Sequence, residues 1–218
     1  MSPDEARTSR WQRRIERAEE LARVSPVYPE VLNFYIEIAK FQSAPSHNLD
    51  ALLEVIRRTA PGPLKECADA DPMHAFFARV LLQAETEQRA RESAAPGGVQ
   101  PLCPFCGEKP VAAVLRPEGD GAKRFLLCSM CFTEWEFRRL LCPNCGEEDQ
   151  DKLPIYTAEE FPHVRVEACD SCHVYLKAVD LTKNGLAVPE VDELASVALD
   201  LWAAEHGYTK LQTNLFGL

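Results

Sequence analysis

Eight cysteines arranged in four C-x-x-C pairs limit the fold of this 218-residue chain more than any other feature. The pairs are Cys103/Cys106, Cys128/Cys131, Cys142/Cys145 and Cys169/Cys172. Two residues between thiolates let one tight turn direct both sulfurs at the same ion, and two such turns complete a tetrahedral Cys₄ site. The first two pairs are separated by 21 residues and the last two by 23, close to the spacing of C-x₂-C…C-x₂-C metal ribbons.

The cysteine region is also an internal repeat. Residues 102–108 (LCPFCGE) match residues 141–147 (LCPNCGE) at a displacement of 39, and the trailing pair of the first repeat recurs 41 residues later. Each repeat therefore supplies one leading and one trailing pair, which favours two sequential metal sites over an interleaved pairing. We name the predicted ligand sets cluster one (Cys103, Cys106, Cys128, Cys131) and cluster two (Cys142, Cys145, Cys169, Cys172). Gly107 and Gly146 directly follow the leading pairs and suit a positive φ there.

Four thiolates suit either zinc or iron, and tetrahedral S₄ geometry does not distinguish them. Each repeat is too small to bury much apolar surface, so we expect the ion to substitute for a hydrophobic core. A closed Cys₄ site leaves no coordination position for a substrate, which argues against metal-centred catalysis. Thioredoxin-like chemistry is also disfavoured, because it needs one reactive pair at a helix N-terminus rather than four repeated pairs.

The remaining candidate residues carry weaker signals. Cys67 stands alone and is expected to be a small buried or partly buried hydrophobe. His173 follows Cys172 and is expected beside the site or on the surface. The other histidines share no spacing and are expected to be surface or helix-cap residues: His47, His74, His163 and His206. No catalytic triad, phosphate loop or dinucleotide motif is visible, so we predict no catalytic residues and no enzyme activity.

The N-terminal region is predicted to be helical. Trp11, Ile15 and Ala18 recur at helical spacing, and further helices are expected to begin at Pro29, after an Asn48 N-cap and after Asp71-Pro72. The segments 43–46 and 60–63 are predicted to be breakers, and residues 93–100 a linker.

After the linker, short β-prone runs appear, and a last helix is expected from about Pro189 to His206, with Leu201 on its apolar side. The predicted fold class is α+β: an N-terminal all-α domain, two tandem rubredoxin-like or zinc-ribbon knuckle units and a C-terminal helix. The predicted domains are residues 1–95 (helical), 96–140 (first Cys₄ knuckle unit), 141–183 (second Cys₄ knuckle unit) and 184–218 (C-terminal helix and tail packed on the rest).

The charge and hydropathy of the chain limit where the protein is expected in the cell and which kinds of partner it can bind. The formal net charge of −10 disfavours nucleic acid, and two divalent ions bound by eight thiolates would move it to −14. No apolar run reaches the roughly 20 residues of a membrane span, and the arginine-rich N-terminus is unlike a secretion signal, so we expect a cytoplasmic protein without stable membrane insertion. In that reducing compartment cysteines are better metal ligands than disulfide partners.

The second repeat is acidic. Residues 146–170 hold eight acids against Lys152 and Arg165. A solvated loop is the simpler interpretation, and an acidic surface that docks a basic partner segment is the alternative.

These motifs together resemble the formate dehydrogenase accessory proteins of the FdhE type over about residues 101–210. The motifs are CPFCG (103–107), LCSMC (127–131) running into TEW (133–135), CPNC (142–145), CDSC (169–172), YLK (175–177), DELASVALD (192–200) and GY (207–208). The resemblance implies a maturation factor, or chaperone, that helps to assemble or activate respiratory formate dehydrogenase in the cytoplasm. It also implies contact with the immature catalytic subunit of that enzyme, and iron rather than zinc in clusters one and two.

Two other functions are weighed against this one. A rubredoxin-like electron-transfer protein would use iron in the Cys₄ sites, since iron changes oxidation state there and zinc does not. A nucleic-acid-binding zinc ribbon is disfavoured by the net charge. The sequence leaves open whether the chain forms a homodimer.

Overall fold

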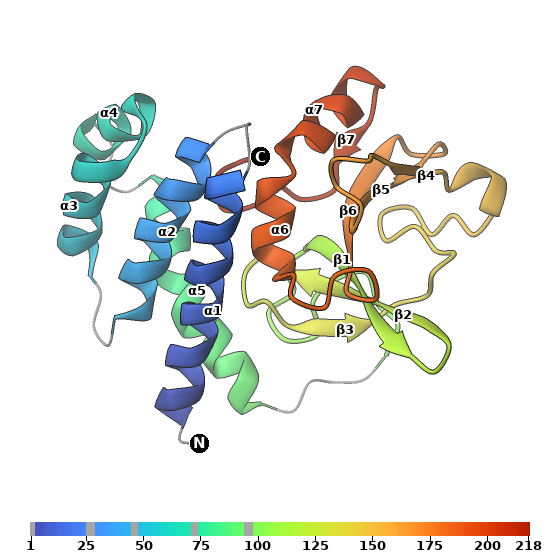
Figure 1. The fold of residues 1–218 in the computed structure, drawn as a ribbon, viewed down its shortest axis with the longest axis horizontal. Helices are drawn as coiled ribbons and strands as arrows, with labels where there is room; N and C mark the ends of the chain where they lie inside the picture. Colours follow the sequence, from blue (N-terminus) through green and yellow to red (C-terminus); the bar gives the residue numbers. More distant parts are fainter. Residues whose placement is uncertain (1–2, 25–28, 45–47, 71–73, 94–97) are drawn as a thin grey trace. The chain divides into compact units, whose positions relative to one another are not determined.

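The computed structural model describes residues 3–24, 29–44, 48–70, 74–93 and 98–218. The chain divides into two compact units, Met1–Arg89 and Ala90–Leu218. The first unit is helical, and the second combines a mixed sheet with two C-terminal helices (Figure 1). This architecture confirms the predicted α+β class. The finer boundaries at residues 95, 140 and 183 remain predictions.

The helical unit follows the predicted periodicity closely. Its helices are α1 (Pro3–Val24), α2 (Pro29–Ser43), α3 (Leu49–Thr59), α4 (Gly62–Ala70) and α5 (Ala75–Glu92), the last of which runs into the second unit. Trp11, Ile15 and Ala18 are buried as predicted. Asn48 caps α3, because its side-chain oxygen accepts a hydrogen bond of 3.0 Å from the Ala51 N–H. The predicted Asp71-Pro72 cap lies outside the described residues.

Helix α4 differs from the sequence prediction, which assigns its first residues, Gly62 and Pro63, to a breaker between helices. Proline is tolerated in the first turn of a helix, where the backbone N–H groups have no intrahelical acceptor. The same residues therefore start a helix here instead of interrupting one.

Buried polar contacts tie the helices of this unit together. The Arg14 guanidinium donates two hydrogen bonds, of 2.7 and 3.0 Å, to the Glu87 carboxylate, and it lies 4.4 Å from the centre of the Trp11 ring. The Gln42 amide donates a hydrogen bond of 2.8 Å to the Val80 carbonyl. Helices α1 and α2 are thus each bonded to α5 in the interior, where an unpaired partner would be costly.

Within residues 98–218, all of which are described, seven strands form one mixed sheet (Figure 1). Its strands are β1 (Pro110–Glu118), β2 (Gly121–Cys128), β3 (Glu134–Glu136), β4 (Ile155–Thr157), β5 (Val164–Cys169), β6 (Val174–Asp180) and β7 (Thr209–Lys210). The order is β3-β2-β1-β6-β5-β4, with β7 paired to β6. Strand β1 of the first repeat pairs in parallel with β6 of the second, from Ala112 opposite Lys177 to Leu115 opposite Asp180. The two cysteine repeats therefore share one sheet.

The predicted C-terminal helix is broken in two. Helices α6 (Pro189–Ala195) and α7 (Val197–Glu205) meet at Ser196, whose hydroxyl donates hydrogen bonds of 2.9 Å to the carbonyls of Asp192 and Glu193. This side chain competes with the backbone ladder. The break shifts the buried face, so Leu199 and Ala203 are buried, whereas Leu201, placed on the apolar side by the sequence pattern, is 49% exposed.

A buried charged network fastens these helices to the sheet. The Lys177 ammonium lies 3.0 Å from Glu193 Oε1 and 2.6 Å from Asp200 Oδ2, and Lys210 pairs with both carboxylates. The Tyr175 hydroxyl donates a hydrogen bond of 2.8 Å to Asp200. Burial alone would raise the pKa of Glu193, but Lys177 and Lys210 outweigh burial and hold that pKa below its ordinary value. Two ammonium groups therefore balance two carboxylates inside the fold.

Among the described residues, no helix combines the length and the apolar character needed to span a bilayer.

Candidate metal centres

The fold gathers the eight predicted cysteines into two groups. In each group the four sulfurs lie within 4.8 Å of one another, and the eight cysteines of residues 98–218 are free thiols. In cluster one the Cys103–Cys131 and Cys106–Cys128 sulfurs are 3.5 and 3.3 Å apart. In cluster two the Cys142–Cys172 and Cys145–Cys169 sulfurs are 3.8 and 3.6 Å apart.

These separations suit a tetrahedral ion. Metal–sulfur bonds of about 2.3 Å place the four sulfurs of a tetrahedron roughly 3.8 Å apart. The sulfur pairs given above, at 3.3–3.8 Å, lie close to that separation. Each group collects the cysteines of one repeat, which is the sequential arrangement and not the interleaved one.

Every C-x-x-C turn ends in a left-handed residue. The residue after the second cysteine has a φ of +78° at Gly107, +52° at Phe132, +79° at Gly146 and +53° at His173. The Gly107 and Gly146 N–H groups donate hydrogen bonds of 3.0 Å to the carbonyls of the first cysteines of their pairs. The leading glycines match the sequence expectation. The trailing turns adopt the same conformation with Phe132 and His173, residue types that rarely do so.

Backbone and side-chain donors point at several sulfurs. The Met130 N–H donates a hydrogen bond of 3.3 Å to Cys128 Sγ, and the Asn144 N–H donates one of 3.4 Å to Cys142 Sγ. The Thr133 hydroxyl lies 3.1 Å from Cys131 Sγ. Donors of this kind stabilise the thiolate form that a metal requires.

Hydrogen bonds among the four cysteines of cluster one give their thiols unequal pKa values. Hydrogen bonds from Cys106, Cys128 and Cys131 lower the pKa of Cys103, whereas hydrogen bonding with Cys103 and Cys106 raises the pKa of Cys128 and that of Cys131. In cluster two, burial raises the pKa of Cys142 and brings the pKa of Cys169 to about 12. One thiolate thus forms readily in cluster one, while four thiolates together require the charge of a cation.

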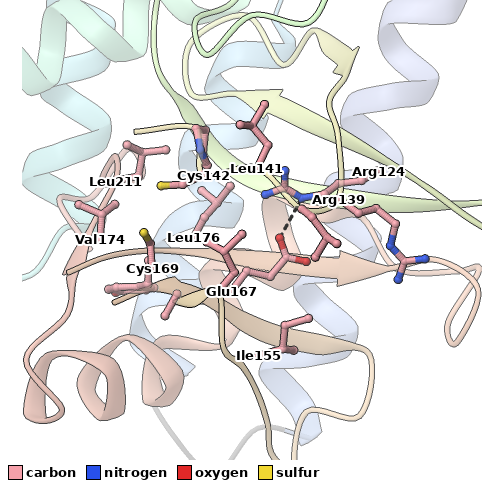
Figure 2. Close-up of a pocket in the computed structure, with 15 residues that line it drawn as sticks. Arg124, Arg139, Leu141, Cys142, Ile155, Glu167, Cys169, Val174, Leu176 and Leu211 are labelled. Atoms are coloured by element: carbon pink, nitrogen blue, oxygen red, sulfur yellow. Dashed lines mark hydrogen bonds and ion pairs between the residues drawn. The ribbon is translucent and has the colours of Figure 1, made fainter. Parts of the chain in front are cut away.

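A small cleft borders cluster two. It has a volume of about 40 Å³, and its walls include Cys142, Cys169 and apolar residues such as Leu141 and Ile155. Figure 2 shows the two cysteine side chains at one side of the cleft and the Arg124–Glu167 ion pair at another. A cavity of this volume holds a few water molecules and no larger metabolite.

The remaining sequence candidates lie outside the sulfur groups. The His74 ring accepts a hydrogen bond of 3.2 Å from the Phe76 N–H at the start of α5, and His206 Nδ1 lies 2.7 Å from the Trp202 carbonyl at the end of α7. These are the expected helix-end positions. His173 is exposed, as one alternative proposed. His47 and the Cys67 side chain lie outside the described residues.

His163 departs from the expectation of a surface or cap residue. Its Nε2 lies 2.7 Å from Oδ1 of buried Asp192, whose other oxygen accepts a hydrogen bond from the Val188 N–H at the start of α6. His163 therefore holds a buried carboxylate. No local pattern marks this role, because the two residues are 29 positions apart in the chain.

Part of the acidic second repeat has a local structural role. The Ser171 hydroxyl donates a hydrogen bond of 2.5 Å to Glu147, which also accepts from the Asp149 N–H, and these bonds lower the pKa of Glu147 to about 2. Glu147 thereby joins the leading and trailing turns of cluster two. Asp149 caps the short 3₁₀ helix Gln150–Lys152 by accepting from the Asp151 N–H.

Comparison with known proteins identifies the family of this chain. The family model "FdhE, central domain" matches residues 102–139, and "FdhE, C-terminal domain" matches residues 140–216. Together they cover more than half of the chain. The chain belongs to the FdhE family.

Curated relatives agree with this assignment. An FdhE homolog of Aquifex aeolicus is 42% identical over 116 residues, which are 53% of this chain and 41% of that protein. A Haemophilus influenzae homolog is 38% identical over 115 residues, 52% of this chain and 37% of that protein. The matched region thus spans about two fifths of the length of these relatives. An Edwardsiella ictaluri FdhE homolog is 29% identical over 97% of this chain and 67% of its own length.

The fold is also that of a solved FdhE structure. The crystal structure of the FdhE protein from Pseudomonas aeruginosa superimposes with a TM-score of 0.77 and covers 94% of each chain. The sequence identity is 23%, so this likeness concerns the fold.

Proposed function

We propose that clusters one and two each bind one metal ion through four thiolates, with iron favoured over zinc by the family resemblance. The observation that carries this proposal is the convergence of eight free sulfurs from four turns into two groups with tetrahedral spacing. The donor set is chemically suited to either ion. When bound, the ion supplies the positive charge that four neighbouring thiolates need, and two C-x-x-C turns supply its ligands in each cluster.

The chain itself, on this proposal, is a non-catalytic accessory factor of respiratory formate dehydrogenase. It acts in the cytoplasm and binds the immature catalytic subunit during assembly or activation. Membership of the FdhE family supports this function, together with the motif resemblance. Four protein ligands per ion leave no coordination position for a substrate. Metal-stapled turns also hold exposed side chains in place at low entropic cost when a partner binds.

Metal content of anaerobically purified protein tests the ligand sets. The wild-type chain is expected to carry two ions. Replacing both pairs of one repeat with serine (Cys103, Cys106, Cys128 and Cys131) is expected to remove one ion. Replacing the two leading pairs (Cys103, Cys106, Cys142 and Cys145) is expected to remove both ions. An interleaved arrangement that joins the two leading pairs predicts the reverse: two ions lost in the first variant and one in the second.

Co-purification tests the partner. Tagged wild-type protein is expected to recover the formate dehydrogenase catalytic subunit from anaerobic extract, and a strain lacking the protein is expected to lose formate dehydrogenase activity. The exposed-charge variant Lys183→Ala provides a control with unchanged cysteines. Full enzyme activity in the deletion strain, with no recovery of the catalytic subunit, would contradict the proposal.

A second candidate function is electron transfer by iron in the same clusters. The N–H donors to Cys128 and Cys142 sulfurs favour it, since such hydrogen bonds tune the potential of iron–sulfur centres. Visible absorption of the iron-loaded protein, bleached by a reductant and restored by reoxidation, would support this function. A colourless protein that holds zinc and still activates formate dehydrogenase would exclude it.

A further inference from the structure

Clusters one and two differ in how far their sulfurs are from solvent. In cluster one, Cys103, Cys128 and Cys131 are 4%, 0% and 1% exposed, and Cys106 is half-buried. In cluster two, Cys142 and Cys169 are buried, Cys172 is half-buried and Cys145 is exposed. The second residue of the leading pair is therefore the most open ligand in each repeat, and only in cluster two does it reach the surface.

The difference extends to the residues around the sulfurs. Cluster one lies inside a hydrophobic cluster with Leu126, Trp135 and Phe137, against which Phe105 and Met130 also pack. The Trp135 ring is held by a hydrogen bond of 2.8 Å from its N–H to the Gln100 carbonyl.

The repeat itself encodes this contrast. At equivalent positions of the turns, half-buried Phe105, Met130 and Phe132 of the first repeat correspond to exposed Asn144, Ser171 and His173 of the second. The Thr133 hydroxyl beside Cys131 Sγ corresponds to Val174, which has no side-chain donor. Three apolar side chains of the first-repeat turns, of which Phe105 and Met130 pack against cluster one, are thus replaced by exposed polar side chains in the second.

Cluster two is also open on another side. The cleft of about 40 Å³ reaches the buried pair Cys142 and Cys169 (Figure 2). Water therefore reaches these two cysteines through the cleft, and Cys145 is exposed to larger ligands.

We propose that cluster two is an exchangeable metal site and that cluster one retains its ion. This inference rests on the proposed binding of one ion by each cluster. Ligand substitution at a Cys₄ ion requires an incoming soft donor, such as a thiolate, to approach as one metal–sulfur bond breaks. At cluster two, exposed Cys145 would be the departing ligand: the incoming thiolate would take its coordination position, the Cys145 thiolate would be released to solvent, and the oxidation state of the ion would not change. At cluster one, Trp135, Phe105 and Met130 obstruct the same approach.

Zinc release from the full chain tests the inference. Protein loaded with two zinc ions is mixed with excess chromogenic chelator, and the released metal is followed over time. We expect two phases of one ion each, with rates that differ by at least about tenfold. Cys145→Ser is expected to remove the fast phase, and the matched variant Cys106→Ser is expected to remove the slow phase. Equal rates, or the opposite assignment, would overturn the inference.

Two further measurements leave all cysteines in place, so they do not require a cysteine variant to fold. In zinc-loaded wild-type protein, alkylation mapped by mass spectrometry is expected to modify Cys145 before any cysteine of cluster one. Exchanging the covers of the leading turns is expected to change both rates: Asn144→Phe should slow the fast phase, and Phe105→Asn should hasten the slow phase. Unchanged rates in both exchanges would contradict the inference. Binding of fewer than two ions at the outset would instead contradict the proposed function.

Discussion

Arg124 Nε of strand β2 lies 2.9 Å from Glu167 Oε2 of strand β5, so a buried ion pair joins the two cysteine repeats. The same guanidinium donates to the Arg138 carbonyl at 3.0 Å and lies 5.5 Å from the centre of the Phe137 ring. Burial would raise the pKa of Glu167, but Arg124 and Arg165 outweigh burial and lower that pKa. Arg124 thus stabilises the Glu167 carboxylate beside the cleft of cluster two. The same arginine lies against the Phe137 ring, which packs with the cysteines of cluster one.

Arg124→Met is expected to destabilise the fold by about 2–3 kcal/mol, because Glu167 stays buried with Arg165 as its remaining cation. Urea unfolding at pH 7 measures this effect. A carboxylate whose pKa is lowered by folding stabilises the protein above its unfolded pKa of about 4.3 and loses that contribution as the pH falls through the folded pKa. The difference between wild type and variant should therefore shrink below about pH 4.

Arg116→Met is the matched control for that variant. Arg116 pairs with Glu134 at 2.6 Å but is 46% exposed, so its loss is expected to cost less than about 1 kcal/mol. Equal destabilisation by the two substitutions would show that burial of the Arg124 ion pair does not increase its contribution to the free energy of unfolding.

Metal binding is expected to weaken on acidification. Hydrogen bonding with Cys103 and Cys106 raises the pKa of Cys131, and burial raises the pKa of Cys169, so protons occupy part of each cluster at neutral pH and must leave when the ion binds. Competition titrations against a chelator, at pH 8 and pH 6, should show lower zinc affinity at pH 6. Proton release in weakly buffered solution gives an independent measurement. An affinity that does not change with pH would contradict binding by thiolates.

Gly146→Ala is expected to destabilise the protein by about 1 kcal/mol, because φ is +79° and alanine disfavours that region. A Cβ there meets no atom within 4 Å, so backbone strain alone is tested. His173→Gly relieves the same strain at φ +53° and should be neutral or stabilising. Thermal unfolding of the zinc-loaded protein distinguishes the two signs, and destabilisation by His173→Gly would show that the histidine ring contributes to the turn.

Lys177→Met is expected to cost about 3 kcal/mol or more, since it leaves Glu193 and Asp200 buried with one ammonium group between them. Denaturant unfolding followed by tryptophan fluorescence measures the loss. Lys152→Met is the control, because Lys152 is exposed and lies 3.7 Å from Glu147. A cost below 1 kcal/mol for Lys177→Met would mean that Lys210 alone balances both carboxylates.

Local sequence patterns predicted the local features of the molecule. The Asn48 cap, the buried face of α1 and the positive φ at Gly107 and Gly146 each depend on residues within one or two turns of the chain. The prediction that residues 60–63 only interrupt helices was wrong for a related reason, since Pro63 has opposite effects at a helix start and in a helix interior.

Features that depend on contacts between distant parts of the chain could not be predicted from local sequence patterns. Strands β4 and β7 are three and two residues long, too short for a recognisable alternation, and pairing with β5 and β6 defines them. The partners of Lys177 in the buried network lie 16 to 23 residues further along the chain. In the sequence this lysine is an ordinary strand residue between Leu176 and Ala178.

The amino-acid sequence by itself determined the number of cysteine groups, their membership and the conformation of the two leading turns, because C-x-x-C spacing, a following glycine and a repeat are local features of the chain. Only the tertiary structure decided that both repeats share one sheet through β1 and β6, and that cluster one is enclosed while Cys145 of cluster two is exposed. Strand pairing and solvent exposure depend on which distant segments meet, and a pattern of neighbouring residues does not specify those meetings.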